Sequence, residues 1–469
     1  MSFQLEGCGK QSESQNGAGG AAIQPHYLGQ EANNPHLYVE TRTLMGTVFR
    51  LIVSLEQAKG PAEDLASVRK RAKRACQLAF DEVHRVESKM SDHLSGSDVV
   101  RINQAASKAF AAHASVSPTK VSKDTMLVLQ EALQASRLTD GAFDVSYAAL
   151  KPAWHMNAEG PHHVPTGAKI ARALKFVGYR RIVLSPQDGT VRLAQHMRID
   201  LGGIAKGYAL DRASVALKQA GFQNFIVYGG GDLMVSGRRP KRPWRVGIQD
   251  PKHPQDYFAV LSVTNLAVVT SGDYERFFVK NGKRYHHIIN PKTGRPARGL
   301  RSVTVVADRA VYADAMATGL FVMGLDRAKR LVERIPDTEA LFVTSSGNVV
   351  ATSGLRSAVT YLGPYQPKKK FDHAAGIRAR TGMRPQARTG NKAPLAKPPT
   401  AAPGQDDMGA RPLLSPRTLR SARPAPAVTP HAKDMAARRP TAAARSSSGM
   451  AARRAPKTPH PARHQGRNQ

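Results

Sequence analysis

Two groups of residues between positions 284 and 318 have types and spacings that could do chemistry. His286 and His287 are adjacent, and neighbouring side chains of an extended segment point to opposite sides, so at most one of them faces a given site. Asp314 and Thr318 are four residues apart and would lie one above the other on a helix. A carboxylate and a hydroxyl so placed form half of an oxygen-only site of the kind that suits Mg²⁺ or Ca²⁺. A histidine turn that leads into such a helix indicates an enzyme that handles phosphate.

The glycine-rich segment 200–207, DLGGIAKG, offers a second kind of chemistry. Gly202 and Gly203 allow the backbone to approach a ligand or an ion closely, and the helix predicted behind them presents free N–H groups to an anion. Lys206 falls in the first turn of that helix, where a cation opposes the helix dipole at a cost of roughly 0.3–1 kcal/mol. A bound phosphate explains this placement, and the alternative is an exposed lysine at a tight turn.

Neither standard nucleotide-binding motif is present. A dinucleotide fingerprint that starts at Gly229 would need glycine where the chain has Met234, and a P-loop would need Ser or Thr directly after Lys206, where the chain has Gly207. Each motif above also has an ordinary structural alternative: core or surface histidines, or an exposed helix face with nothing bound.

The formal charge of +34 is concentrated towards the C-terminal end. From Lys368 to Gln469 there are 22 Lys and Arg against four Asp and Glu, a net charge of +18 in a stretch rich in Pro, Ala, Ser and Arg. Such a composition buries too little apolar surface to offset the entropy of ordering, so we expect residues 365–469 to be a disordered basic tail. A solvated tail without a fixed partner is the simpler interpretation, and weak polyanion binding, to nucleic acid or anionic lipid, is the alternative. Residues 1–36, rich in Gly, Ser, Gln and Asn, are also predicted to be disordered.

The two cysteines exclude both a disulfide framework and a thiolate metal cluster. Cys76 falls in an apolar helical pattern and is predicted to be core. Cys8 follows Leu-Glu-Gly as in a lipoprotein cleavage site, but no apolar segment precedes it. No stretch has the apolar length of a membrane span. As written, the chain is expected to be cytoplasmic, unless its true start lies upstream and encodes an export signal.

Residues 37–364 are predicted to form one large α+β domain, with grouped strands and helices outside them. Apolar residues recur in steps of three and four at residues 68–90, 126–138, 209–220 and 328–335, and these segments, with the one that carries Asp314, are predicted helices. Strands are expected at residues 43–49, at 191–199, in succession between 225 and 269, at 302–306 and as a pair around 346–347.

Taken in order, the motifs resemble the successive signatures of the ApbE family, the FAD:protein FMN transferases or flavin transferases. The resemblance covers about residues 37–363. The matching segments are Met45-Gly46-Thr47, residues 91–103, 139–144, 200–211, 229–233 and 270–274, the turn 287–294, and residues 313–318.

The resemblance implies an enzyme that binds FAD and Mg²⁺, joins FMN through a phosphoester to a threonine or serine hydroxyl of a target flavoprotein, and releases AMP. By the same resemblance Asp314, Thr318 and the backbone carbonyl of Gly203 would hold Mg²⁺, and His287 would be catalytic. The residues that would line the FAD site are Met45, His93, Ala142, Phe143, Asp144, Lys206 and Ile288. The acceptor would be a respiratory or electron-transport flavoprotein subunit, such as those of sodium pumps.

Four features depart from the family pattern. His93 stands where many relatives have Tyr, and Asn290 replaces a common Asp. The export signal and lipid anchor usual in bacterial members are not found, and the basic tail is not part of the pattern.

Two other classes of function stay open beside the transferase. An FAD pyrophosphatase would use water in place of the protein hydroxyl and release FMN and AMP. A non-catalytic flavin carrier would bind FAD without releasing AMP, with its tail on nucleic acid or membrane. Flavin fluorescence that stays with an acceptor band in a denaturing gel distinguishes the transferase from both.

Overall fold

The computed structural model describes residues 34–56, 63–154, 163–239, 242–253 and 255–362. The segments predicted to be disordered, 1–36 and 365–469, lie outside these residues except for 34–36, and so does Cys8. The domain boundaries at 37 and 364 stay predictions. Within the described part of the chain no helix is both long enough and apolar enough to cross a bilayer.

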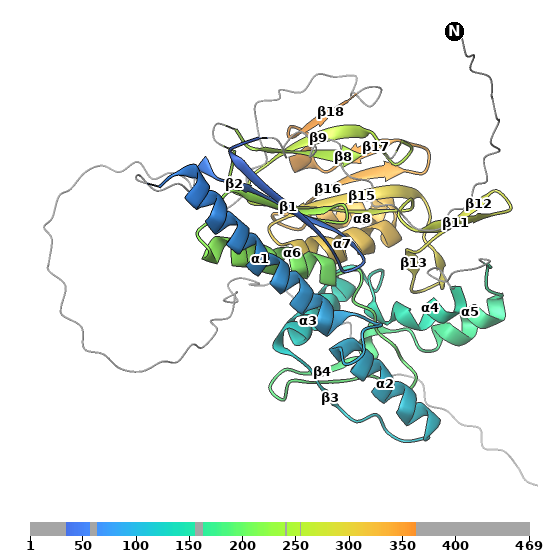
Figure 1. The fold of residues 1–469 in the computed structure, drawn as a ribbon. Helices are drawn as coiled ribbons and strands as arrows, with labels where there is room; N and C mark the ends of the chain where they lie inside the picture. The colour runs from blue at the N-terminus through green and yellow to red at the C-terminus, as the bar shows by residue number, and fades with distance from the viewer. Residues whose placement is uncertain (1–33, 57–62, 155–162, 240–241, 254, 363–469) are drawn as a thin grey trace, which may run out of the picture. The chain divides into compact units, whose positions relative to one another are not determined.

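An eight-stranded antiparallel sheet forms the centre of the fold (Figure 1). Its strand order is β1-β2-β6-β7-β10-β15-β16-β17, so segments from both ends of the domain meet in one sheet. The strands are β1 Leu37–Leu44, β2 Thr47–Ser54, β6 Phe225–Gly229, β7 Asp232–Ser236, β10 Ala267–Gly272, β15 Leu300–Ala307, β16 Glu339–Thr344 and β17 Val349–Ala351.

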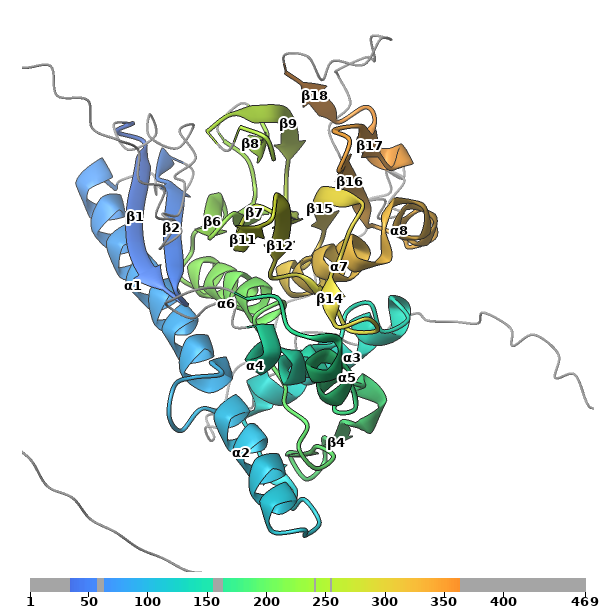
Figure 2. The ribbon, with the colours of Figure 1, turned by 90° about the vertical axis from the view of Figure 1, so that its right-hand side faces the viewer.

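Helices cover one face of this sheet: α1 (Leu65–Met90), α6 (Ala205–Gln219) and α7 (Ala310–Met323) (Figures 1 and 2). Alternation along the strands explains the layering, because successive side chains point to opposite faces. Leu51 and Val53 of β2 enter the core under the helices, whereas Ile52 enters a second core on the other face. The second core lies against a three-stranded sheet of β8 (Trp244–Gln249), β9 (Tyr257–Val263) and β18 (Val359–Tyr361).

Smaller elements complete the described part of the chain. A third apolar cluster joins Trp154 and Ile170 to Phe278, and Trp154 Nε1 donates a hydrogen bond to Gly294 O at 2.8 Å. The smaller elements are the helices α2 (Asp98–Ala111), α3 (Lys123–Leu138), α4 (Lys151–Trp154), α5 (Gly167–Leu174) and α8 (Leu325–Val332), the 3₁₀ helices Val145–Leu150, Tyr179–Arg181 and Ser353–Leu355, the sheet β3 (Thr119–Lys120), β5 (Thr190–Arg192) and β4 (Val183–Ser185), and the hairpins β11 (Phe277–Lys280) with β12 (Lys283–His286) and β13 (Ile289–Asn290) with β14 (Arg295–Pro296).

The α+β class is confirmed, and so are the predicted helices that became α1, α3, α6, α7 and α8. Cys76 is fully buried as predicted, and burial raises the pKa of its thiol. Two predicted strands are wrong. Residues 43–49 are not one strand, because Met45 and Gly46 adopt φ of 52° and 68° and close the β1–β2 hairpin. Of residues 191–199 only the first two are in a strand, β5.

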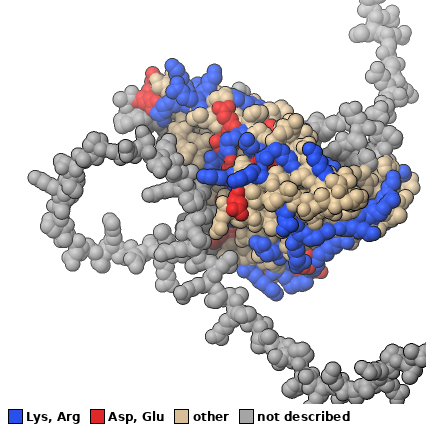
Figure 3. Space-filling model, turned by 90° about the horizontal axis from the view of Figure 1, so that it is seen from below, with Lys and Arg blue, Asp and Glu red and all other residues tan. Residues whose placement is uncertain are grey.

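Positive charge extends beyond the predicted tail. The net charge of +34, less the +18 carried by residues 368–469, leaves +16 on residues 1–367. The face seen from below in Figure 3 carries more Lys and Arg than Asp and Glu. A basic patch on this protein is therefore informative only when something besides its charge sets it apart.

Candidate active site

The helices α6 and α7 meet at the first turn of α6. A Cβ added to Gly207 would lie 2.2 Å from Ala310 O and 2.8 Å from Asp314 Cβ, so only glycine permits this approach. The Gly207 N–H donates a hydrogen bond to Asp314 Oδ2 at 2.8 Å. One turn further on, the Asp211 carboxylate accepts hydrogen bonds from the first two N–H groups of α7, at 2.9 Å each. The start of α6 is thereby fixed against the helix that carries Asp314.

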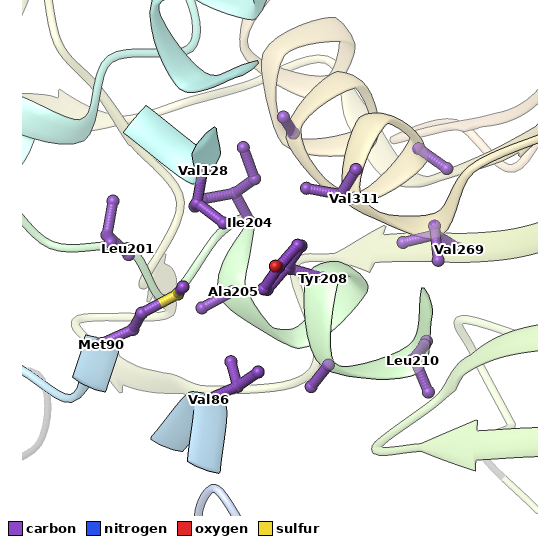
Figure 4. Packing of buried hydrophobic residues seen from close by; sticks show 14 of the residues in the cluster. Val86, Met90, Val128, Leu201, Ile204, Ala205, Tyr208, Leu210, Val269 and Val311 are labelled. Carbon is purple, nitrogen blue, oxygen red and sulfur yellow. The ribbon is translucent and has the colours of Figure 1, made fainter. Parts of the chain in front are cut away.

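Apolar side chains pack around the same turn from more than one side, as Figure 4 shows. Ile204, Ala205 and Tyr208 are buried there against side chains of α1, α3 and α7. The Tyr208 hydroxyl donates a hydrogen bond to the Asp124 carboxylate of α3. Their labelled neighbours in the figure are Val86, Met90, Val128 and Val311.

Gly203 and Thr318 also come together. An added Cβ on Gly203 would lie 3.6 Å from Thr318 Oγ1 and 3.3 Å from the Phe143 ring. Thr318 Oγ1 in turn lies 3.1 Å from Ser271 Oγ at the end of β10. The three residues predicted to hold a metal thus gather at the junction of α6 and α7, and they offer only oxygen atoms. No cluster of three His, Cys, Asp or Glu side chains suited to a metal ion occurs among the described residues.

The ionised form of the Asp314 side chain is disfavoured in this position. Burial raises its pKa to about 7, and the nearby carboxylates of Asp232 and Asp211 act in the same direction, against Lys206 and the Gly207 N–H. A carboxylate whose charge is disfavoured by burial gains most from a neighbouring cation. The donor set and this electrostatic state fit a hard divalent cation such as Mg²⁺.

Lys206 is neither an exposed lysine nor free of partners. Its ammonium pairs with the Asp232 carboxylate, which is 1% exposed, and Asp232 Oδ1 accepts a hydrogen bond from Thr270 N at 3.1 Å. Burial works against the charge on Lys206, but Asp232 and Asp314 outweigh it and raise the pKa of the ammonium. Lys206 is therefore a fixed positive charge beside Asp314, and it ties α6 to β7 and β10.

The loop that follows α3 packs on this junction. Ala142 and Phe143 are buried, and Phe143 lies against both Gly203 and Gly319 of α7. The Asp144 carboxylate closes the loop, because it accepts hydrogen bonds from Ser146 N and Tyr179 N at 2.8 Å each. Burial raises the pKa of Asp144. The structure shows Asp144 holding the loop that presents Phe143.

An ionic link joins the segment around His93 to the glycine-rich segment. The His93 side chain is 75% exposed and lies 3.2 Å from Asp92 Oδ1. Lys151 Nζ pairs with Asp92 at 2.5 Å and with Asp200 at 2.9 Å. The other oxygen of Asp200 accepts a hydrogen bond from Gly202 N at 2.7 Å. Lys151 thus connects the segment around His93, which is predicted to line the FAD site, with the glycine-rich segment that contains Gly203. The two carboxylates that it joins are more than a hundred residues apart in sequence.

Met45 lies at the tip of the β1–β2 hairpin. Its partly buried side chain packs on the core beneath the helices, and Thr47 beside it contacts Gly230 in the turn between β6 and β7. The same turn leads into Asp232, the partner of Lys206.

The two histidines point to opposite sides, as the strand pattern predicts. His286 is buried with its ring 5.6 Å from that of Phe321, its Nε2 lies 2.9 Å from Ala297 O, and its Nδ1 has no hydrogen-bond partner among the described residues. His287 is half-buried, and its backbone N–H donates to Arg276 O at 3.0 Å. The neighbouring Ile288 is buried.

The imidazole of His287 is held neutral. Desolvation lowers its pKa to about 3, and the positive charges of Arg276, His286 and Lys206 act in the same direction. The contact of the His286 ring with Phe321 shows that the histidine turn packs against α7, the helix that carries Asp314. A neutral imidazole beside an oxygen-rich metal site can accept a proton from an incoming hydroxyl.

Sequence reasoning missed several residues that build this site: Gly207 as the point of helix contact, Asp232 as the partner of Lys206, Ser271 beside Thr318, and Lys151. Ser271 and Asp232 lie in motifs that carried the resemblance, at the end of one strand and after a run of three glycines, and could have been singled out there. Lys151 has no local signal, because both of its partners are distant in sequence.

Comparison with known proteins gives consistent matches. The model of the ApbE family matches residues 45–342. The FAD:protein FMN transferase of Haemophilus influenzae is 33% identical over 279 residues, 56% of this chain and 78% of that protein. The FAD:protein FMN transferase of Klebsiella pneumoniae is 31% identical over 280 residues, 59% of this chain and 84% of that protein.

Solved structures agree in fold. The crystal structure of an ApbE protein from Thermotoga maritima superposes with a TM-score of 0.60 and 33% sequence identity, and covers 69% of this chain and 99% of that one. The flavin transferase ApbE from Vibrio cholerae superposes with a TM-score of 0.57 and 28% identity, and covers 68% and 97%.

Proposed function

This chain belongs to the ApbE family, and from that premise we propose that it is an FAD:protein FMN transferase. It transfers FMN from FAD to a threonine or serine hydroxyl of a target flavoprotein and releases AMP. The observation that supports the proposal is the convergence of Gly203, Asp314 and Thr318 at the start of α6, on the helix α7 against which the histidine turn packs.

The reaction exchanges the phosphoanhydride bond of FAD for a phosphoester bond to the acceptor. The acceptor hydroxyl oxygen forms a bond to the phosphorus of the FMN half of FAD, the bond from that phosphorus to the bridging oxygen breaks, and AMP leaves with that oxygen. Phosphoryl transfer depends mainly on positioning and on neutralising charge. Asp314, Thr318 and the backbone of Gly203 would hold Mg²⁺, which supplies charge neutralisation for the diphosphate.

His287 takes the hydroxyl proton. Its ring is neutral in the free protein, so the lone pair that a base needs is available at pH 7. An anionic diphosphate bound nearby raises the pKa of an imidazole, because opposite charges favour the protonated form. Binding of FAD therefore makes His287 a stronger base at the stage when the acceptor arrives.

The remaining predicted residues position FAD. The closed loop after α3 holds Phe143 against Gly203, in the segment that would hold the metal, and Lys206 supplies a fixed positive charge. Lys206 is already paired with Asp232, so we assign it an electrostatic influence on the diphosphate. Met45, His93, Ala142, Asp144 and Ile288 complete the proposed FAD site.

The test uses the purified chain, FAD, Mg²⁺ and a flavin-free flavoprotein subunit of a respiratory sodium pump. Fluorescence that stays with the acceptor band in a denaturing gel, with one AMP released per flavin attached, supports the transferase. Free FMN and AMP without a labelled acceptor would instead identify a pyrophosphatase. Bound FAD without AMP release would identify a flavin carrier.

A further inference from the structure

The β11–β12 hairpin exposes apolar side chains among positive charges. Val279 is 59% exposed and Phe277 43% exposed, both on β11. From residue 276 to residue 287 the chain has four Lys and Arg and no Asp or Glu, and Lys280 and Lys283 at the tip are exposed. No ion pair neutralises these two lysines within the described part of the chain, whereas Arg284 pairs with Asp273 at 3.1 Å.

The opposite face of the hairpin is anchored. Phe278 and Tyr285 stack at 5.2 Å between ring centroids, and Tyr285 lies 5.9 Å from the ring of Trp154. The exposed face therefore belongs to a fixed element. No third strand joins the hairpin among the described residues, so the outer edge of β11 is open to an added strand.

The hairpin leads directly to His287. The ladder pairs Phe277 with His286, and the hydrogen bond from His287 N to Arg276 O adds one more rung beyond it. Val279 is three residues from Arg276, which is about 10 Å along a strand. A segment that lies along the outer edge of β11 and contacts Val279 can thus place a residue three positions away beside Arg276, whose carbonyl oxygen binds His287 N.

We propose that the β11–β12 hairpin is the docking site of the acceptor flavoprotein, which lays an extended, acidic segment along β11 and thereby holds its hydroxyl-bearing residue near the end of the hairpin that leads to His287. This inference rests on the proposed function, because it takes the second substrate to be a protein. Charge complementarity selects an acidic segment, since an acidic partner is attracted to Lys280 and Lys283 and a basic one is repelled. Phe277 and Val279 supply the apolar contact.

Two ordinary explanations compete with docking. Single exposed apolar residues are common on protein surfaces, and lysines on an edge strand discourage unwanted pairing. Val183 provides the comparison, because it is a 43% exposed valine on a strand at the edge of another sheet, in β4. A docking role predicts that changes at Val279 matter and that the same change at Val183 does not.

The experiment measures transfer kinetics with the sodium-pump subunit as the acceptor. We expect Val279→Asp, and separately the double change Lys280→Glu and Lys283→Glu, to raise KM for the acceptor about tenfold or more, while kcat at saturating acceptor stays within about twofold. A tenfold change corresponds to about 1.4 kcal/mol of binding. Val183→Asp should leave both constants unchanged, and FAD affinity, measured by quenching of flavin fluorescence, should be the same in all variants. Raising the salt concentration should raise KM in the unaltered chain more than in the charge-reversed variant.

The outcomes separate the two proposals. If the unaltered chain labels the acceptor and Val279→Asp behaves like Val183→Asp, docking at the hairpin is wrong and the transferase stands. If the unaltered chain attaches no flavin to the acceptor, the proposed function and the docking role both fail. Should the charge reversal leave the acceptor KM unchanged but abolish binding to phosphatidylglycerol vesicles, the lysines serve a membrane surface and the docking proposal is overturned.

Discussion

The two sides of the candidate site are built in opposite ways. On the α6–α7 side, Gly207 brings two helices into backbone contact, and the charges of Lys206, Asp232 and Asp314 are buried together. On the β11–β12 side, two strands stand without a third among the described residues, with Val279 and Lys280 exposed. His287 connects the two sides.

The difference corresponds to what each side receives in the proposed reaction. A metal ion and a diphosphate require donor atoms that are held in position to within a fraction of an ångström. Buried side chains with many packing contacts hold donor atoms in this way. A protein substrate needs an accessible surface instead. Changes on the buried side should therefore affect folding, metal and chemistry together, whereas changes on the hairpin side should affect only the acceptor.

The largest effect is expected from Gly207→Ala. The new methyl would lie 2.2 Å from Ala310 O, so α6 and α7 would have to separate. We expect a loss of about 3 kcal/mol in the free energy of unfolding and no detectable transfer. The matched control is Gly167→Ala at the start of α5, where nothing lies within 4 Å and the change should be neutral or slightly stabilising. Urea unfolding of both variants checks this, and equal stability of the two would show that the helix contact is not tight.

Asp314→Asn should separate chemistry from stability. The raised pKa of about 7 means that the folded protein binds a proton more readily than the unfolded chain, whose Asp titrates near ~3.9. The contribution of Asp314 to stability is thus fully present below about pH 4 and is lost as the pH rises through about 7. We expect the variant to lose transfer, to lack Mg²⁺-induced stabilisation, and without metal at pH 8 to melt about 2 °C or more above the unaltered chain.

The control for this prediction is Asp140→Asn, an exposed carboxylate paired with Lys292. It should change neither the melting temperature nor its response to Mg²⁺. If Asp314→Asn still melts higher when Mg²⁺ is added, residue 314 is not a ligand.

His287→Ala should break the chemistry while leaving the buried side intact. Loss of a general base costs about 10²–10⁴-fold in rate, whereas FAD binding should be nearly unchanged. The neighbouring variant His286→Gln keeps a donor for Ala297 O and should retain transfer with lower stability. Single-turnover labelling and FAD titration test the pair, and near-normal transfer by His287→Ala would overturn the role.

The smallest effect is expected from Lys151→Met. It leaves Asp92 and Asp200 without their shared cation, although Tyr147 still donates to Asp200 at 2.8 Å and Gly202 N–H remains bound. We expect a roughly tenfold loss of transfer with a higher Mg²⁺ requirement, and recovery in Lys151→Arg, which restores the charge. A Mg²⁺ titration of both variants decides whether Lys151 positions the glycine-rich segment.

Local patterns revealed much of this molecule. The spacing of apolar residues indicated α1 and α3, and the four-residue spacing of Asp314 and Thr318 already indicated a shared helix face. The helix α2 was missed although its signal is local: Ser97 caps it, and Val99, Ile102, Ala106 and Ala109 form its buried stripe.

Other features depend on contacts between distant segments. Residues 191–199 are expected from the sequence to form a strand, yet the backbone of Ile199 is bound by the Asn103 side chain at 2.8 and 2.9 Å. Met45 adopts a left-handed conformation that its residue type does not favour. The pairing of Lys206 with Asp232 joins residues 26 apart, and nothing near either one predicts it.

The hydrogen bond from His287 N to Arg276 O bears on how the enzyme would limit the hydrolysis of FAD by water. The hairpin is held on one face by Phe278 and Tyr285, and a third strand along β11 would steady its open edge as well. An arriving acceptor segment would stiffen the ladder whose last rung is the bond from the His287 backbone N–H to Arg276 O, so the residue that accepts the proton becomes ordered together with the alcohol that needs it. A water molecule adds no strand to the hairpin. The enzyme would therefore favour transfer of FMN to the acceptor over hydrolysis of FAD, because His287 becomes ordered when the acceptor arrives.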